Sequence, residues 1–100
     1  MLTADQILKK LEENKEKIRS FGIKRLALFG SYLKNEQKEG SDIDFLVEFE
    51  QDKKTFDNYF GLKFFLERLF NCKVDLVIKE VIKEEIKPHI LEDIKYAEGL

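Results

Sequence analysis

The sequence predicts an α/β (α+β) fold in which a small mixed β-sheet of three or more strands is flanked by helices. Apolar runs of strand length occur at residues 23–29, 42–49 and 73–78. The segments around them carry apolar residues at the three- and four-residue spacing of amphipathic helices. The predicted order is therefore α-β-α-β-α-β-α. A chain of 100 residues is long enough for a single core, so we expect residues 1–100 to form one domain.

The first predicted helix spans residues 4–20. Thr3 and Gln6 match a capping box, in which the side chain of each residue accepts a hydrogen bond from the backbone of the other. Gly22 is expected to end the helix because glycine readily adopts the left-handed conformation found after helix ends. Four apolar residues recur at helical spacing and are expected to be buried: Ile7, Leu8, Leu11 and Ile18.

The longest predicted helix runs over residues 56–70, after a charged turn at residues 50–54. Thr55 is suited to cap its first turn, and Asn71 is suited to end it. The apolar residues of this helix form a broad face, which we interpret as core that covers the sheet. These residues are Phe56, Tyr59, Phe60, Phe64, Leu66 and Leu69.

Pro88 divides the last stretch of the chain, because proline suits the first turn of a helix and disfavours helix at the residue before it. We therefore expect a short helix near residues 80–87 and a terminal helix near residues 88–98. His89 is expected to be a surface or capping residue. Four residues are expected to pack inwards: Ile86, Ile90, Leu91 and Ile94.

Two carboxylates begin the second predicted strand. Side chains alternate between the faces of a strand, so Asp42 and Asp44 point to the same side while Ile43 and Phe45 point to the other. Two carboxylates held side by side repel each other unless a positive charge lies between them. A divalent cation with oxygen ligands is the usual solution.

A Gly-Ser pair follows the first predicted strand. Gly30 allows the backbone to turn sharply and to approach a ligand closely. Ser31 is suited to cap a short helix over residues 31–34, and the free N–H groups of a helix N-terminus bind phosphate. A phosphate site beside a metal site predicts binding of a metal-bound nucleoside triphosphate.

With these motifs the chain resembles the nucleotidyltransferase superfamily that includes DNA polymerase beta. Its signature is an apolar residue followed by Gly-Ser, then Asp-x-Asp between apolar residues, and later a third carboxylate. Here these parts are Phe29-Gly30-Ser31, Asp42-Ile43-Asp44 and Val74-Asp75-Leu76. More narrowly, the chain resembles the minimal nucleotidyltransferase (MNT) proteins, the antitoxins of HEPN/MNT toxin–antitoxin pairs. The resemblance covers nearly the whole chain and implies the nucleotidyltransferase fold.

The resemblance also implies roles for individual residues. Asp42, Asp44 and Asp75 are the expected catalytic residues and would ligate Mg²⁺, with two ions expected. The ATP phosphates would be held by Gly30 and Ser31. Lys34 stands where the family often carries Arg, so we consider it either a phosphate-binding point charge or an ordinary surface lysine.

The acceptor of the nucleotide is expected to come from outside the chain. Relatives that act on tRNA ends, growing strands or antibiotics carry additional domains for the acceptor, and a chain of this length has no room for one. The resemblance implies that AMP is placed on a tyrosine of a HEPN toxin encoded nearby. Two alternatives are a non-catalytic module that neutralises its partner by contact, and a nucleotidyltransferase for a small-molecule or RNA acceptor.

The composition limits the remaining function classes. A net charge of −2 gives no global attraction to nucleic acid or to anionic membranes. No apolar run approaches the length of a membrane span, and the N-terminus lacks a signal-peptide pattern, so we expect a cytoplasmic protein. Cys72 is the single cysteine and is interpreted as a buried thiol. Self-association of the chain stays open.

Overall fold

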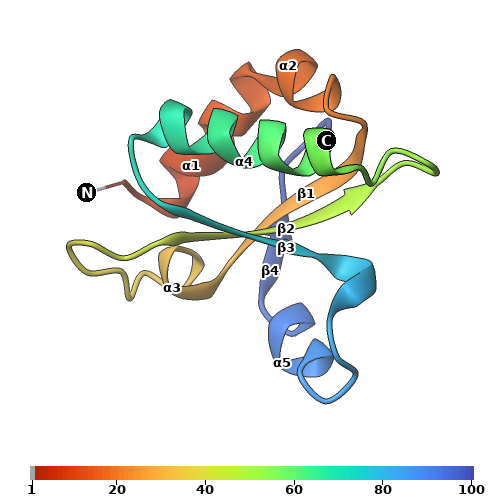
Figure 1. Cartoon of the computed structure of the whole chain (residues 1–100). Helices are drawn as coiled ribbons and strands as arrows, with labels where there is room; N and C mark the ends of the chain where they lie inside the picture. Colours follow the sequence, from red (N-terminus) through yellow and green to blue (C-terminus); the bar gives the residue numbers. More distant parts are fainter. Residues whose placement is uncertain (1) are drawn as a thin grey trace.

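The computed structural model describes residues 2–100 and contains a four-stranded mixed sheet (Figure 1). The strand order is β3-β2-β1-β4. β1 runs antiparallel to both of its neighbours, β2 and β4, whereas β2 and β3 are parallel. The α+β class and the mixed sheet predicted from the sequence are thus confirmed.

The elements follow the predicted order as far as β3. In chain order they are α1 (Ala4–Glu13), α2 (Lys15–Arg19), β1 (Ile23–Phe29), α3 (Gly30–Leu33), β2 (Ile43–Phe49), α4 (Phe56–Phe70), β3 (Val74–Ile78), the 3₁₀ turn η1 (Lys79–Val81), α5 (Lys87–Leu91) and β4 (Ile94–Tyr96).

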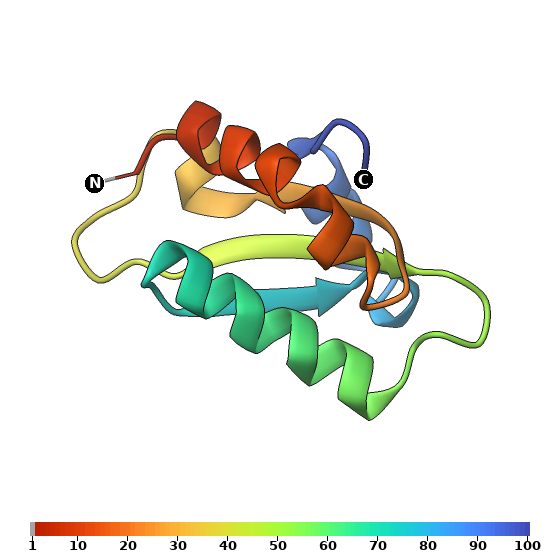
Figure 2. The same ribbon diagram turned by 90° about the horizontal axis from the view of Figure 1, so that it is seen from above.

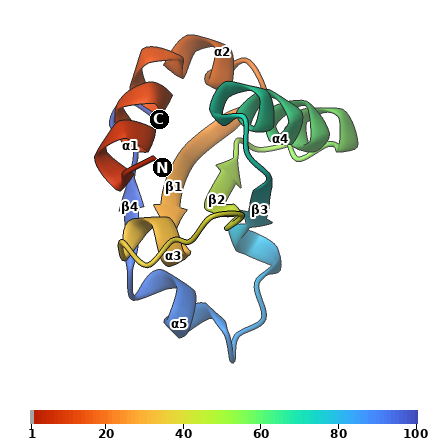
Figure 3. The ribbon, with the colours of Figure 1, turned by 90° about the vertical axis from the view of Figure 1, so that its left-hand side faces the viewer.

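The main core lies on one face of the sheet, beneath α1, α2 and α4. Figures 2 and 3 show α1 and α4 running along this face, while α5 lies on the other side of the sheet. Alternation along the strands explains the arrangement, because every second side chain of β2 points into this core. The buried core residues of β2 are Ile43, Phe45, Val47 and Phe49. Among residues 2–100, no helix combines the length and apolar character needed to cross a bilayer.

The N-terminal helix is interrupted. The predicted capping box of Thr3 and Gln6 is present, but the single helix predicted over 4–20 divides at Asn14. The side chain of Asn14 donates to the carbonyl of Lys10 over 2.8 Å, and such local bonds favour caps over helix interiors. All four predicted apolar residues are nevertheless buried.

The aromatic face of α4 differs from the prediction. The bounds and the Thr55 cap agree with it, and Asn71 ends the helix in the left-handed conformation. However, the fully buried residues are Leu62 and Leu66. Phe56, Phe60 and Phe64, which we call the aromatic stripe, lie on a row that points away from the core. Phe56 is 75% exposed and Phe64 is 52% exposed, so the interpretation of these two as core was wrong.

The C-terminal prediction was also wrong. Residues 79–81 form only a 3₁₀ turn, helix α5 is short, and residues 94–96 form strand β4 instead of continuing a helix. The four-residue spacing of Ile86, Ile90 and Ile94 imitated a helix period. Pairing with the otherwise open edge of β1 decides the outcome, because it satisfies backbone groups that a helix there would leave exposed. Ile86 is 48% exposed, so it does not pack inwards.

Candidate active site

A row of side chains crosses the sheet at the end where β2 and β3 begin. Asp44 pairs with Asp75 on one side and with Phe29 on the other, and Phe29 in turn pairs with Ile94. Residues paired in this way point to the same face of a sheet. Their neighbours Ile43 and Phe45 point into the main core, so the row faces the opposite side, away from α1 and α4. Two predicted site residues therefore lie side by side.

The carboxylates of this row repel one another. The side chain of Asp44 is half-buried, whereas Asp42 and Asp75 are exposed. The pKa of Asp44 is raised to about 6, first by burial, then by the negative charges of Asp75 and Asp42, and finally by a hydrogen bond with Asp75. The negative charges of Asp42 and Asp75 thus both act on the carboxylate of Asp44. At neutral pH these three carboxylates carry excess negative charge, and within residues 2–100 none of them takes part in an ion pair.

Gly30 makes room for the Asp44 carboxylate. Its φ of +77° is in the left-handed region that favours glycine. A Cβ atom at this position would also collide with Oδ2 of Asp44. The sequence predicted that glycine here permits a close approach to a ligand. The structure shows that the group it admits is a carboxylate from the neighbouring strand.

Ser31 occupies a different helical position from the predicted cap. Helix α3 is a single turn that begins at Gly30, and its N-cap is Phe29, which has no side-chain capping bond. Ser31 is therefore the second residue of the turn, and its carbonyl accepts from the N–H of Glu36 over 2.8 Å. The first N–H groups of a helix have no partner within it. Ser31 thus still presents its backbone at the end of β1, two residues after Phe29, the strand partner of Asp44.

Lys34 ends α3 and pairs with the C-terminal segment. Its Nζ lies 3.9 Å from Oδ2 of Asp93, with half or more of each side chain exposed. An exposed pair of this kind contributes little to stability because water and salt screen it. Lys34 is therefore available to exchange Asp93 for another anion.

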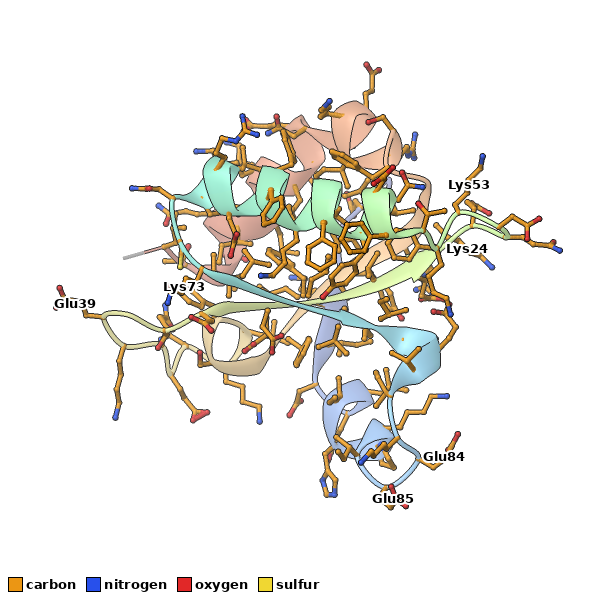
Figure 4. All side chains as sticks on the ribbon, in the orientation of Figure 1. Lys24, Glu39, Lys53, Lys73, Glu84 and Glu85 are labelled. Carbon is orange, nitrogen blue, oxygen red and sulfur yellow. The ribbon has the colours of Figure 1, made fainter. Side chains whose placement is uncertain are left out.

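A pocket missed by the sequence analysis adjoins Asp42. It has a volume of about 470 Å³ and is lined by residues from α3, the loop before β2 and the loop before β3: Tyr32, Gly40, Ser41, Asp42, Asn71, Cys72 and Lys73. Figure 4 labels Lys73, which immediately precedes β3. The Cys72 thiol donates to the carbonyl of Ser41 over 3.4 Å and is only partly buried. No local pattern could reveal the pocket, because its residues come from three separate segments.

A second polar group occupies the same face further along the strands. The Oε2 atom of Glu48 accepts from the Tyr96 hydroxyl over 3.1 Å and lies 3.7 Å from the Lys79 ammonium. The Arg25 guanidinium lies 3.5 Å from the centre of the Tyr96 ring. Burial, followed by the charge of Glu48, raises the pKa of Tyr96. Continued alternation along β2 from Asp44 was the only sequence signal for Glu48 on this face.

The three carboxylates of Asp42, Asp44 and Asp75 are a set of ligands that fits a divalent cation such as Mg²⁺. Carboxylate oxygens are its preferred ligands, and a cation would offset the repulsion from Asp75 and Asp42, which adds to the effect of burial in raising the pKa of Asp44. Within residues 2–100, no three His, Cys, Asp or Glu side chains are already gathered in a metal-binding arrangement. Asp42 and Asp75 are exposed and lie close enough to Asp44 for their charges to raise its pKa, so these three carboxylates would be the ligands of an ion bound here.

The chain is similar to known proteins along nearly its whole length. The model of the nucleotidyltransferase domain family matches residues 5–97. The chain is similar to the protein adenylyltransferase MntA of Thermococcus cleftensis, with 37% identity over 97 residues that cover 96% of this chain and 97% of the relative. Both matches span the Gly-Ser turn and all three acids.

Solved structures share the fold. One described as a minimal nucleotidyltransferase superposes with a TM-score of 0.71 at 30% identity, covering 88% of this chain and 93% of its own. A second, a toxin–antitoxin structure with AMP-PNP, gives a TM-score of 0.69 at 25% identity, covering 99% of this chain and 75% of its own.

Replacement of Asp44 should make the metal-free protein more stable at neutral pH. Between the unfolded pKa of 3.8 and the folded pKa of about 6, the folded protein binds more protons than the unfolded chain. Its free energy of unfolding therefore falls as pH rises through this window. For a half-exposed group the screened penalty is about 1–2 kcal/mol. Asp44→Asn should remove it and raise Tm at pH 7 by about 5 °C or more.

The measurement is a series of EDTA-treated thermal melts from pH 4 to pH 8. Asp52→Asn makes the same chemical change in an exposed turn and should keep the wild-type dependence on pH. If wild type and Asp44→Asn showed the same pH profile, the crowding of acids around Asp44 would be disproved.

Substitution of Gly30 should damage the site more than substitution of another left-handed glycine. Gly30→Ala introduces both a strained φ and a collision with Asp44, whereas Gly40→Ala introduces only the strain, because nothing lies near its Cβ position. We expect Gly40→Ala to cost about 1 kcal/mol and Gly30→Ala clearly more. In an Asp44→Ala background the extra cost of Gly30→Ala should shrink. Equal costs for the two glycines, by urea unfolding, would contradict this account.

Proposed function

The chain belongs to the nucleotidyltransferase domain family and is a nucleotidyltransferase, and we propose that it moves AMP from ATP to a tyrosine of a partner HEPN toxin. The observation that carries the proposal is the juxtaposition of Asp44 and Asp75 with the Gly30 turn at one end of the sheet. In this proposal the protein acts as an antitoxin in the cytoplasm, and residues 1–100 form one minimal catalytic domain.

Each residue of the site has a task in this reaction. Asp42, Asp44 and Asp75 would hold Mg²⁺, with two ions expected, and the metal would neutralise phosphate charge and lower the pKa of the acceptor hydroxyl. The backbone at Gly30 and Ser31 would orient the β- and γ-phosphates. The acceptor oxygen attacks the α-phosphorus, the bond to the bridging oxygen breaks, and pyrophosphate leaves. The proton of the acceptor hydroxyl passes to Asp75, which is exposed and faces the open side of the sheet.

The acceptor would approach from the side of the sheet that lacks α1 and α4. Val81 is 61% exposed and Ile86 is 48% exposed, and both belong to the segment that Figure 3 shows on the α5 side of the sheet. An exposed apolar surface on the same side of the sheet as the acids is suited to contact with a protein. The relation to a protein adenylyltransferase and to a toxin–antitoxin structure supports a protein acceptor over a small molecule.

Loss of a single acid should abolish transfer. With ATP labelled in its α-phosphate, Mg²⁺ and the partner toxin, wild type should place label on the toxin and add the mass of AMP. Asp42→Asn and Asp44→Asn should transfer less than about one-hundredth as much, because each removes a ligand from the charge-stabilising site. Mg²⁺-ATP at 100 times Kd should stabilise wild type by about 2.7 kcal/mol, which is measured as a rise in Tm. Both variants should lose this stabilisation.

Asp52→Asn is the matched control and should transfer normally. Full activity of Asp44→Asn would refute the catalytic role of the row. If the toxin binds tightly, stays unlabelled and is still inhibited, the chain acts instead as a non-catalytic binding module. Label on RNA or on a small molecule, with none on the toxin, would identify the other alternative acceptor.

Lys34 should contribute to ATP binding and little to the chemical step. Its weak pair with Asp93 would be exchanged for phosphate oxygens, so Lys34→Ala should raise KM for ATP by about three- to tenfold with kcat nearly unchanged. Lys38→Ala, at an exposed lysine of the following loop, is the control and should change neither constant. An unchanged KM in Lys34→Ala would make Lys34 an ordinary surface lysine.

A further inference from the structure

The aromatic stripe of α4 has no function in the proposed reaction. Phe56, Phe60 and Phe64 follow one another at four-residue intervals along the helix. The centres of the Phe56 and Phe60 rings lie 4.6 Å apart, and those of Phe60 and Phe64 lie 5.9 Å apart. Two of the three rings are at least half exposed. A continuous row of rings with two exposed members is typical of an interaction surface.

An acceptor protein is the wrong occupant for this surface. The inner residues of α4, Leu62 and Leu66, pack on the core face of the sheet. Asp44 and Asp75 point to the opposite face, so the sheet separates the stripe from the site. Figure 3 shows α4 and α5 on opposite sides of the sheet. A partner that delivers a hydroxyl to the carboxylates must contact the α5 side, which leaves the aromatic stripe unoccupied.

The charges beside the stripe match a second copy of the same chain. Asp57 lies exposed in the first turn of α4, and Arg68 lies exposed in its last turn. Within residues 2–100, neither takes part in an ion pair. They are about three turns apart, on nearly the same side of the helix and separated by roughly 16 Å. They cannot meet within one chain.

Antiparallel packing of two α4 helices brings these charges together. A two-fold axis through the middle of the stripe places Asp57 of one copy opposite Arg68 of the other, twice. The same axis places Phe60 of one copy against Phe64 of the other, because the midpoints of both pairs fall within one helical turn. Rows of side chains at four-residue spacing are also the ridges that interlock when two helices pack. Pairing of charge and packing of rings therefore require the same symmetry.

The β3 edge of the sheet offers a second copy a poorer route. The outer edge of β3 is closed by side chains of α4 itself: the Tyr59 hydroxyl donates to the carbonyl of Leu76 over 2.6 Å. The Glu67 carboxylate accepts from the N–H of Val74 over 3.1 Å. Capping of edge groups in this way opposes pairing with another strand. The same contacts fix the position of α4 and present its outer face as a rigid surface.

We propose that the chain forms a two-fold symmetric homodimer through the aromatic stripe, with Asp57 of each copy paired to Arg68 of the other. A 15-residue helix supplies a contact smaller than a standard protein interface. The dimer is therefore reversible, and each copy keeps its acidic site open on the outside.

Sedimentation velocity on the intact chain over about 1 µM to 1 mM tests the proposal. Wild type should shift towards twice the 11.9 kDa mass of one chain as concentration rises. Phe64→Ser should raise the dissociation constant by about tenfold or more. Val81→Ser, at a similarly exposed apolar residue on the α5 side, should not change the dissociation constant.

Charge reversal gives the most specific readout. Asp57→Arg alone and Arg68→Asp alone each place like charges opposite one another and should weaken the dimer by about tenfold or more. The double variant restores both pairs and should return to near the wild-type dissociation constant. Both residues are exposed, so melting curves should show that all variants fold.

Three outcomes would overturn the dimer. The first is a chain that stays monomeric up to about 1 mM. The second is a dimer that Phe64→Ser leaves unchanged or that the double charge reversal fails to restore. The third is a monomeric chain that loses binding of its toxin in Phe64→Ser, which would make the stripe a contact with a different protein.

Discussion

The parallel register between β2 and β3 is the constraint on which the rest of the molecule depends. It places Asp44 beside Asp75. It does so because the next residues along the two strands, Phe45 and Leu76, must share the buried face. A shift of one residue would drive carboxylates into the core and expose large apolar side chains. The hydrophobic core thus determines the position of the acids, and no interaction between the acids themselves is needed to bring them together. They come together against their mutual repulsion.

That repulsion explains why the surroundings of Asp44 are so demanding. The carboxylate is half-buried and its pKa is raised to about 6, and the neighbouring turn must be glycine to admit it. The protein thereby keeps a destabilising arrangement at a position where a cation would remove the penalty. Strain and unfavourable charge of this kind are typical of functional sites, where ligand binding compensates for what folding leaves unfavourable.

Local patterns predicted most of the fold and half of the site's geometry. Strand β1, helix α4 and both Thr caps agree with the sequence, because the interactions that define them lie within a few residues. Strand β4 could not be predicted, since its conformation depends on the distant edge of β1. The same holds for the ion pair of Lys34 and Asp93 and for the pocket beside Asp42, whose residues the fold assembles from separate segments. The exposure of Phe64 depends on which side of α4 meets the sheet, and a helix apolar on several sides leaves that choice open.

The two faces of the sheet would allow catalysis and the proposed dimerisation to proceed independently. The acids, Lys34 and the exposed apolar residues Val81 and Ile86 lie on the α5 side. On the other side, α4 buries Leu62 and Leu66 against the sheet, and the rings of the aromatic stripe point outwards. Because Tyr59 and Glu67 bind the β3 edge, α4 cannot roll to bury those rings without breaking two hydrogen bonds. These hydrogen bonds therefore keep the Phe56 and Phe64 rings exposed, and burial of these rings requires a second molecule.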